Sequence, residues 1–169
     1  AALVVGGGAA SVLIAKDPRS AGSLVDDQLI EVKSGASLRE DPLTKPGRII
    51  VSSYNGVVLL AGEVSGEEAK ARAAEIVRAK ANVKNVVNEL HIGDTPPLGA
   101  RSKDAWIATR AKAELLTAEG HTGLKIKVTV DRGVAYLQGM VSRDDGDWAA
   151  TVVSNLPHVH TVVKVFEYP

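Results

Sequence analysis

Residues 48–65 read RIIVSSYNGVVLLAGEVS, and they predict two β-strands joined by a tight turn. Asn55-Gly56 supplies the positive φ angles that a two-residue hairpin turn needs. A spacing of two between apolar residues is typical of strands that bury one face. On the two sides of the turn, the residues with this spacing are Ile49, Val51, Val58, Leu60 and Val64. The stretch is therefore expected to be a β-hairpin.

The hairpin occurs a second time, in residues 124–142, which read LKIKVTVDRGVAYLQGMVS. A constant offset through a turn, a strand and the residue after it indicates a duplicated structural unit. Farther along the chain the offset falls to 76, which predicts one residue lost in the last helix or in the loop after it. The pairs that are 77 positions apart are Gly56 and Gly133, Gly62 and Gly139, and Ser65 and Ser142.

In the first unit the pattern predicts a helix over 24–40, the hairpin, a helix over 66–80 and a strand over 83–92. Leu29, Val32 and Ala36 are expected to form the buried stripe of the first helix. Ser65-x-x-Glu68 is a capping box that predicts the start of the second helix. The residues expected on one face of the last strand are Val86, Leu90 and Ile92.

The second unit repeats this order, with a helix over 102–118, a hairpin that turns at 131–133, and a last strand over 161–168. Ser142-x-x-Asp145 is expected to open its second helix. The buried stripe of its first helix is predicted from the spacing of Ile107, Ala111 and Leu115. Gly62 and Gly139 are interpreted as strand positions of close backbone approach rather than as phosphate-binding glycines.

The duplication predicts an α+β protein with two tandem units, each in the order αββαβ. A right-handed strand–helix–strand crossover returns the third strand parallel to one of the first two, which gives a three-stranded mixed sheet packed against two helices. The expected boundaries are an N-terminal tether over 1–23, a first domain over 24–92, a linker over 93–101 and a second domain over 102–169.

Residues 1–15, AALVVGGGAASVLIA, are fewer than the roughly 20 that a membrane-spanning helix needs. We interpret them as a tether or as the edge of a signal peptide, and expect residues 1 to about 20 to pack little. VVGGGAAS loosely resembles a dinucleotide-binding turn, but Asp17-Pro18 leaves little room for the helix that such a turn requires. No nucleotide cofactor is therefore expected.

Basic and acidic residues both number 20, so attraction to nucleic acid is not a property of the whole chain. The absence of cysteine excludes disulfides, thiolate metal sites and a cysteine nucleophile. His158 and His160 could place two imidazoles side by side, but no carboxylate at a suitable spacing completes a metal site. No catalytic motif is present, so we expect no enzyme activity, no metal and no cofactor.

The two first helices differ in charge. Residues 24–41 contain two basic and five acidic side chains, whereas residues 101–117 contain four basic and two acidic ones. Trp106 lies beside the core stripe of the second of these helices, and Leu116 points away from it. An amphipathic Trp, a free Leu and basic residues suit the headgroup layer of a membrane. The predicted lipid-contacting residues are Trp106, Thr109, Arg110, Lys112, Ala113, Leu116 and Thr117.

The sequence leaves a second interpretation of Trp106 open, in which its ring packs into the seam between the two units. The first unit has Leu29 at the position of Trp106 and Lys33 at that of Arg110. Because the helix that contains Leu29 and Lys33 is acidic, lipid binding is not expected there.

NGVVLLAG and RGVAYLQG, at the centres of the two hairpins, resemble the BON domain. The pair, preceded by KDPRSAGSLVDD and joined through a Pro/Gly linker to SKDAWIATRAKAELL, is similar to the dual-BON outer-membrane lipoproteins of Gram-negative bacteria, the YraP/DolP family. The resemblance extends from about Asp17 to Tyr168. Its most specific parts are the duplication and the D-x-W-I-x-T-[KR] stretch from Asp104 to Arg110.

The resemblance implies a lipidated cysteine upstream of Ala1 and an anchor at the periplasmic face of the outer membrane. It also implies binding of anionic phospholipid, chiefly by the second unit, and roles in envelope integrity and at the division site. The alternative function is a protein-interaction module for envelope or cell-wall partners. We expect a monomer in either case.

Overall fold

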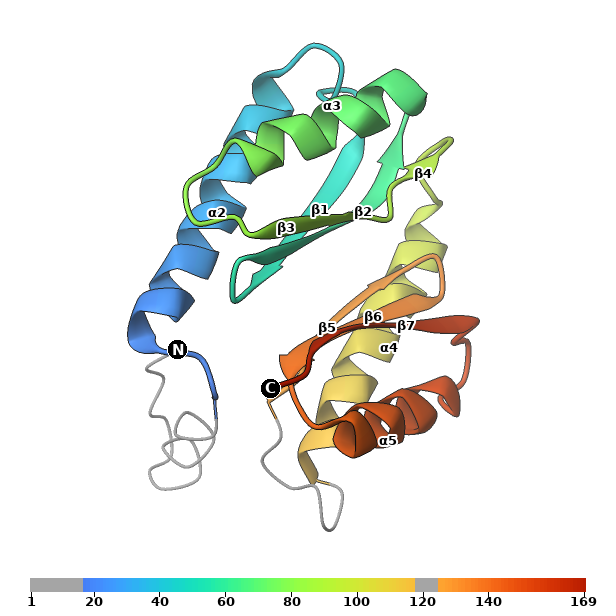
Figure 1. Cartoon of the computed structure of the whole chain (residues 1–169). Coiled ribbons are helices and arrows are strands. Elements are labelled where there is room, and N and C mark those ends of the chain that lie inside the picture. The colour runs from blue at the N-terminus through green and yellow to red at the C-terminus, as the bar shows by residue number, and fades with distance from the viewer. Residues whose placement is uncertain (1–16, 118–124) are drawn as a thin grey trace, which may run out of the picture. The chain divides into compact units, whose positions relative to one another are not determined.

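The computed structural model describes residues 17–117 and 125–169 (Figure 1). Within this part the chain divides into two compact units, which we call the first unit (Arg19–Pro96) and the second unit (Pro97–Pro169). None of the helices in the described ranges has the length and apolarity that crossing a bilayer requires.

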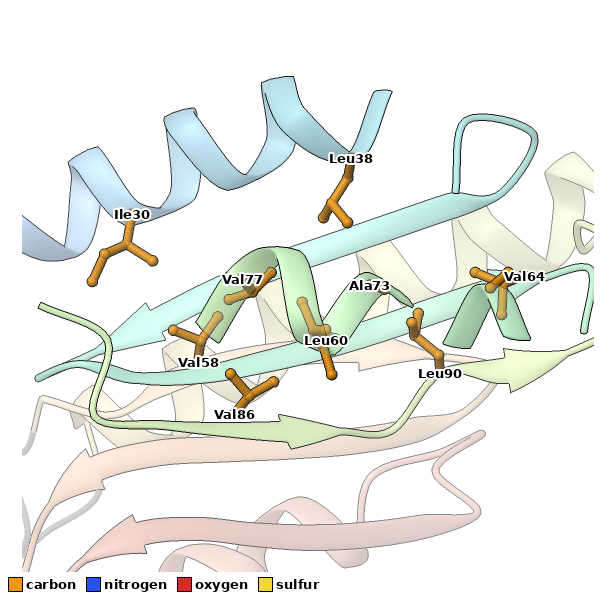
Figure 2. Packing of buried hydrophobic residues seen from close by; sticks show 11 residues of the cluster. Ile30, Leu38, Val58, Leu60, Val64, Ala73, Val77, Val86 and Leu90 are labelled. Atoms are coloured by element: carbon orange, nitrogen blue, oxygen red, sulfur yellow. The ribbon is translucent and has the colours of Figure 1, made fainter. Parts of the chain in front are cut away.

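The first unit contains α2 (Ala21–Glu40), β1 (Arg48–Tyr54), β2 (Val57–Val64), α3 (Glu67–Arg78), β3 (Asn85–Asn88) and β4 (His91–Ile92). Strand β2 pairs antiparallel with β1 and parallel with both β3 and β4. Buried side chains of α2, α3 and the sheet form one cluster, in which the two helices cover the same face of the sheet (Figure 2). Its largest members include Ile30, Leu38, Val58, Leu60, Val77 and Leu90.

The second unit contains α4 (Leu98–Thr117), β5 (Lys127–Asp131), β6 (Val134–Met140), α5 (Arg143–Ser154) and β7 (Thr161–Glu167). Strand β6 pairs antiparallel with β5 and parallel with β7, and α4 and α5 contribute to a second core cluster. Both units therefore have the predicted αββαβ order, with the last strand parallel to the second strand. The α+β fold class is confirmed.

Both hairpins have two-residue turns. Asn55 and Gly56 have φ angles of 50° and 81°, and Arg132 and Gly133 have φ angles of 54° and 74°. Positive values at both positions are those of a type I′ turn, whose twist matches that of the flanking strands. The predicted three-residue turn at 131–133 is one residue too long, because Asp131 belongs to β5 and pairs with Val134.

The third strand of the first unit is interrupted, whereas a continuous strand over 83–92 was expected. Asn88 ends β3 and donates a hydrogen bond from Nδ2 to the carbonyl oxygen of Lys70 at 2.8 Å. Pairing resumes at β4 with the register unchanged. Leu90 is buried as expected, but Ile92 at the end of β4 is 37% exposed and does not share the buried face.

The buried face of α2 is not the predicted one. Leu29 and Val32 are 46% and 68% exposed. The face that packs on the sheet consists of Asp27, Ile30, Ser34 and Leu38. Two of these four buried positions are polar. The spacing of apolar residues therefore predicts the wrong face, the one on the opposite side of α2. In the second unit the predicted stripe of Ile107, Ala111 and Leu115 is confirmed, and all three are buried.

The N-terminal boundary also differs from the expectation. Helix α2 begins at Ala21, within the predicted tether, and Ser20 caps it by accepting a hydrogen bond from the backbone N–H of Ser23. The Arg19 guanidinium lies 4.3 Å from the centroid of the Tyr54 ring, and its side chain is only 10% exposed. Arg19 is therefore packed and Ser20, although exposed, belongs to the cap of α2, while residues 1–16 lie outside the described part of the chain.

The predicted capping boxes have different outcomes. Ser142 caps α5 by accepting a hydrogen bond from the backbone N–H of Asp145 at 3.1 Å, as expected. Ser65 does not cap α3, whose N-cap is Gly66 without a side-chain hydrogen bond. Helices α3 and α5 both have 12 residues and begin 76 positions apart (143 − 67 = 76). The residue lost from the second unit therefore lies before α5, between the strand and the helix, and not in the helix or after it.

Candidate functional site

A buried aspartate of α2 holds the turn of the first hairpin. The Asp27 carboxylate accepts hydrogen bonds from the backbone N–H groups of Asn55 and Gly56, at 2.7 and 3.0 Å. It also accepts one from the Ser53 hydroxyl at 2.7 Å and pairs with Arg19 at 3.1 Å. Burial alone would raise the pKa of this carboxyl, but these hydrogen bonds outweigh burial and hold the pKa below its usual value.

The second unit repeats this arrangement on α4. Asp104 accepts hydrogen bonds from the backbone N–H groups of Arg132 and Gly133, at 2.9 and 3.0 Å. Asp27 and Asp104 are 77 positions apart, in register with the repeat (104 − 27 = 77). From the sequence, both aspartates were counted only among the charges of their helices, although their shared register was a signal of a common role. That role is to fix the first helix of each unit to its hairpin.

Most of the carboxylates that make α2 acidic in sequence point into the first unit rather than to its surface. Asp27 is buried, and Glu31 accepts a hydrogen bond from the backbone N–H of Ser53 at 2.9 Å. Asp41, which follows the helix, pairs with Arg72 of α3 at 2.9 Å. Because these three carboxylates point to partners within the unit, the outer face of α2 is far less acidic than the count of its residues suggests.

Most of the predicted lipid-contacting residues lie on the surface of α4. Trp106 is 46% exposed, a large fraction for an indole ring. Leu116 is half-buried, so it is not the free apolar side chain that its position on the helix predicts. The remaining predicted residues are all exposed: Thr109, Arg110, Lys112, Ala113 and Thr117.

Some of the polar groups on this surface form hydrogen bonds or ion pairs within α4, and others do not. Arg110 Nε lies 3.1 Å from Glu114 Oε1, and the Thr109 and Thr117 hydroxyls donate hydrogen bonds to backbone carbonyls one turn earlier. Within the described ranges, Lys103 and Lys112 have no ion pair. Among the described residues, the uncommitted positive charge of α4 therefore lies on Arg101, Lys103 and Lys112 rather than on Arg110.

Trp106 has an aromatic neighbour that sequence reasoning did not connect with it. The ring of His158, in the loop before β7, meets the indole edge-to-face, with the ring centroids 6.2 Å apart and the planes at 75°. A shallow pocket of about 280 Å³ lies beside this pair, and Gly99, Ser102 and Lys103 complete its lining. The sequence suggests a metal ligand as the role of His158, and no group of three potential metal ligands occurs among the described residues.

Comparison with known proteins identifies the two units. The BON domain model matches residues 26–94 and 103–169. The outer membrane lipoprotein DolP of Haemophilus influenzae is 33% identical over 168 residues, which cover 99% of this chain and 87% of that protein. A 21 kDa hemolysin of Actinobacillus pleuropneumoniae is 35% identical over 153 residues, covering 90% of this chain and 79% of that protein.

Among solved structures, the C-terminal domain of CdsD, a structural protein of the type III secretion system of Chlamydia trachomatis, is similar at 16% identity and a TM-score of 0.33. That match covers 83% of this chain and 65% of the CdsD chain. The family assignment rests on the two domain matches and on the identity with DolP along nearly the whole chain. The chain therefore belongs to the BON-domain family, carries two BON domains in tandem and is a homologue of an outer-membrane lipoprotein.

Proposed function

We propose that this protein is a non-enzymatic lipoprotein of the bacterial envelope that binds anionic phospholipid through α4 of its second BON domain. A lipid anchor holds it at the periplasmic face of the outer membrane, where it supports membrane integrity and localises to the division site. The observation that carries the proposal is Trp106, a half-exposed indole on a helix with uncommitted lysines.

A Trp side chain in this position suits the boundary between lipid headgroups and acyl chains, because its ring is apolar and its N–H is polar. The first unit has Leu29 at the equivalent position (106 − 29 = 77), which offers no such N–H. The outward charge of α4 is also more positive than its sequence count, since Asp104 is buried under the hairpin turn.

The expected affinity of the domain alone is weak. Arg101, Lys103 and Lys112 are exposed and have no ion pair in the described part of the chain. At about 1 kcal/mol per basic residue near an anionic surface, they supply roughly 3 kcal/mol. Stable residence on a membrane takes two signals, so a lipid anchor would keep the protein at the membrane and α4 would select anionic patches.

Co-sedimentation of the soluble chain with vesicles tests the proposal. Wild type should bind vesicles that contain phosphatidylglycerol, release them at high salt, and not bind vesicles of phosphatidylcholine alone. Trp106→Glu should abolish binding without unfolding the protein, because substitutions at exposed sites cost little stability. The matched change Leu29→Glu in the first unit should leave binding intact. Full binding by a folded Trp106→Glu protein would remove α4 from the site.

A second candidate function, docking of an envelope or cell-wall protein, is supported by the outer face of α2. Val25, Leu29 and Val32 on this face are 55%, 46% and 68% exposed. An apolar helix face of this kind suits a protein partner better than it suits anionic headgroups. Binding of a partner there should be insensitive to salt and to vesicle composition, and it should be lost in Val32→Glu but not in Trp106→Glu.

A further inference from the structure

The outward face of α2 has apolar residues at the spacing of a coiled-coil contact. The a and d positions of a heptad recur at alternating intervals of three and four residues, and from position 25 to position 36 of this face they are all apolar. Ile30 and Leu38, which pack on the sheet, lie on the other side of the helix (Figure 2). A surface helix normally carries polar residues on its outward side, so this spacing indicates that a second helix covers α2. We call the heptad positions along this face the outer stripe: Gly22, Val25, Leu29, Val32, Ala36 and Arg39.

The outer stripe is complementary to itself when two copies of α2 lie antiparallel. In such a pair each a residue meets a d residue of the other helix, and two-fold symmetry repeats every contact at the other end. Each contact then joins a larger side chain to a smaller one, which is the condition for close packing between two helices. The space over Gly22, which takes the longest partner, is open in this structure. The layers are Leu29 with Val32, Val25 with Ala36, and Arg39 with Gly22, all pairs whose numbers add up to 61.

The charges beside the outer stripe favour the antiparallel pair. Asp26 and Lys33 directly follow the two d-position valines, and neither has an ion pair within the described residues. In the antiparallel arrangement they lie on opposite sides of the midpoint, so Asp26 of each copy faces Lys33 of the other. A parallel pair would instead place them against Ala21 and Gln28 and would form no ion pair. The charge pattern therefore matches a second copy of this helix in one orientation.

The internal repeat supplies a helix in which the same contact is unfavourable. The residues of α4 at the positions of Asp26 and Lys33 are Lys103 and Arg110, which are both basic. Two copies of α4 in this arrangement would bring like charges together at both ends, which opposes association. The two d-position valines of α2 also become polar in α4, where Ser102 and Thr109 take their places. The self-complementary pattern is therefore a property of the first unit and not of the second.

We propose that two copies of this protein associate through α2, as an antiparallel helix pair with Leu29 and Val32 at its centre. The inference goes beyond lipid binding by α4, does not depend on it, and replaces the monomer expected from the sequence. The outer stripe is about 26 Å long at 1.5 Å per residue, and a strip about 10 Å wide on each helix gives an interface of roughly 500 Å². Interfaces of this size are weak, so the pair should form at a protein concentration on the order of 100 μM.

Disulfide formation between single-cysteine variants of the full chain tests the geometry, because the chain has no cysteine of its own. Val25→Cys and Ala36→Cys are mixed at about 200 μM and oxidised mildly, and the antiparallel pair should give the mixed disulfide. Either variant alone should give little, because its two cysteines would lie 11 residues apart along the stripe (36 − 25 = 11), or about 16 Å. Disulfides in purely statistical proportion, or formed mainly by each variant alone, would overturn the antiparallel pair.

Sedimentation equilibrium of the full chain, without lipid, tests the role of the charges. Lys33→Asp makes both flanking residues acidic and Asp26→Lys makes both basic, so each variant alone should associate about tenfold more weakly than wild type. An equal mixture of the two variants should recover the association, because every flanking charge then meets its opposite. The control is Arg78→Asp, an exposed residue of α3, which changes the net charge as Lys33→Asp does and should leave association unchanged.

Val32→Glu should abolish association with little change in the melting temperature, because it places like charges at the centre of the stripe at a position that is 68% exposed. A wild-type protein that stays monomeric at about 1 mM would assign the outer face of α2 to a different protein and overturn the inference, whatever its binding to vesicles. Association that persists in Val32→Glu would place the contact on another surface. Equal losses in Lys33→Asp and Arg78→Asp would mean that only net charge matters, which also overturns the helix pair.

Discussion

The backbone N–H of Gly56 donates a hydrogen bond to the carboxylate of Asp27 at 3.0 Å. This contact joins a helix to a hairpin turn 29 residues away. The same contact, at the same distance, joins Asp104 to Gly133 in the second unit. Because a buried N–H without an acceptor is costly, the carboxylate stabilises the packing of the helix against the turn.

The first prediction concerns this carboxylate. Asp27→Ala leaves two backbone N–H groups of the turn and the Ser53 hydroxyl without their acceptor, and it should lower the free energy of unfolding of the first unit by about 3 kcal/mol. Asp104→Ala removes two such bonds and should cost about 2 kcal/mol in the second unit. Urea unfolding measures both, and the neighbouring half-buried Asp26→Ala should change stability by no more than about 0.5 kcal/mol.

The second prediction concerns acid. The pKa of Asp27 is lowered in the folded protein, so its contribution to stability is complete above the unfolded pKa of about 3.9 and is lost as the pH falls through the folded value. The melting temperature of wild type should exceed that of Asp27→Asn by a constant amount above about pH 5, and the difference should shrink below about pH 4. A difference that grows on acidification would contradict the role of the ionised carboxylate.

The third prediction concerns two glycines at equivalent positions of the central strands. Gly62 has a φ angle of 110°, and a Cβ atom there would overlap the carbonyl oxygen of Arg48. Gly62→Ala should therefore destabilise the first unit by more than about 2 kcal/mol. At Gly139 the added Cβ would lie 3.2 Å from the carbonyl oxygen of Lys125, which a small shift relieves. Gly139→Ala should cost about 1 kcal/mol or less, and thermal unfolding of the two variants makes the comparison.

The fourth prediction concerns an ion pair in the first sheet. Arg48 contacts the Glu63 carboxylate through both Nε and a terminal nitrogen, at 2.8 and 2.7 Å, and the Glu63 side chain is 2% exposed. Arg48→Ala leaves this carboxylate buried without its charged partner and should cost roughly 3–5 kcal/mol. The second unit has Met140 at the position of Glu63, so adding Glu63→Met to Arg48→Ala should recover much of the loss. A double variant that is less stable than Arg48→Ala alone would contradict this account.

The duplication, the order of elements and the position of the first turn follow from the sequence because they depend on local chemistry. Asn55-Gly56 selects a type I′ turn through its own backbone preferences, whatever surrounds it. The stripe of Ile107, Ala111 and Leu115 was likewise predicted correctly, since this face of α4 is apolar apart from Asp104. Local signals of this kind need no knowledge of what lies across the core.

Contacts between distant residues decided the rest. Asp27 lies on the buried face of α2 although it is polar, because the hairpin supplies hydrogen-bond donors to it, and an apolar pattern cannot reveal such partners. Ser65 matches Ser142 in the sequence, but only Ser142 is an N-cap. In the first unit one extra residue precedes the helix, and Gly66 is the N-cap. His158 meets Trp106 only because the crossover through α5 returns the chain to the end of the sheet beside α4. Spacing along the chain determines which elements form, whereas the packing of those elements determines which side chains share a site.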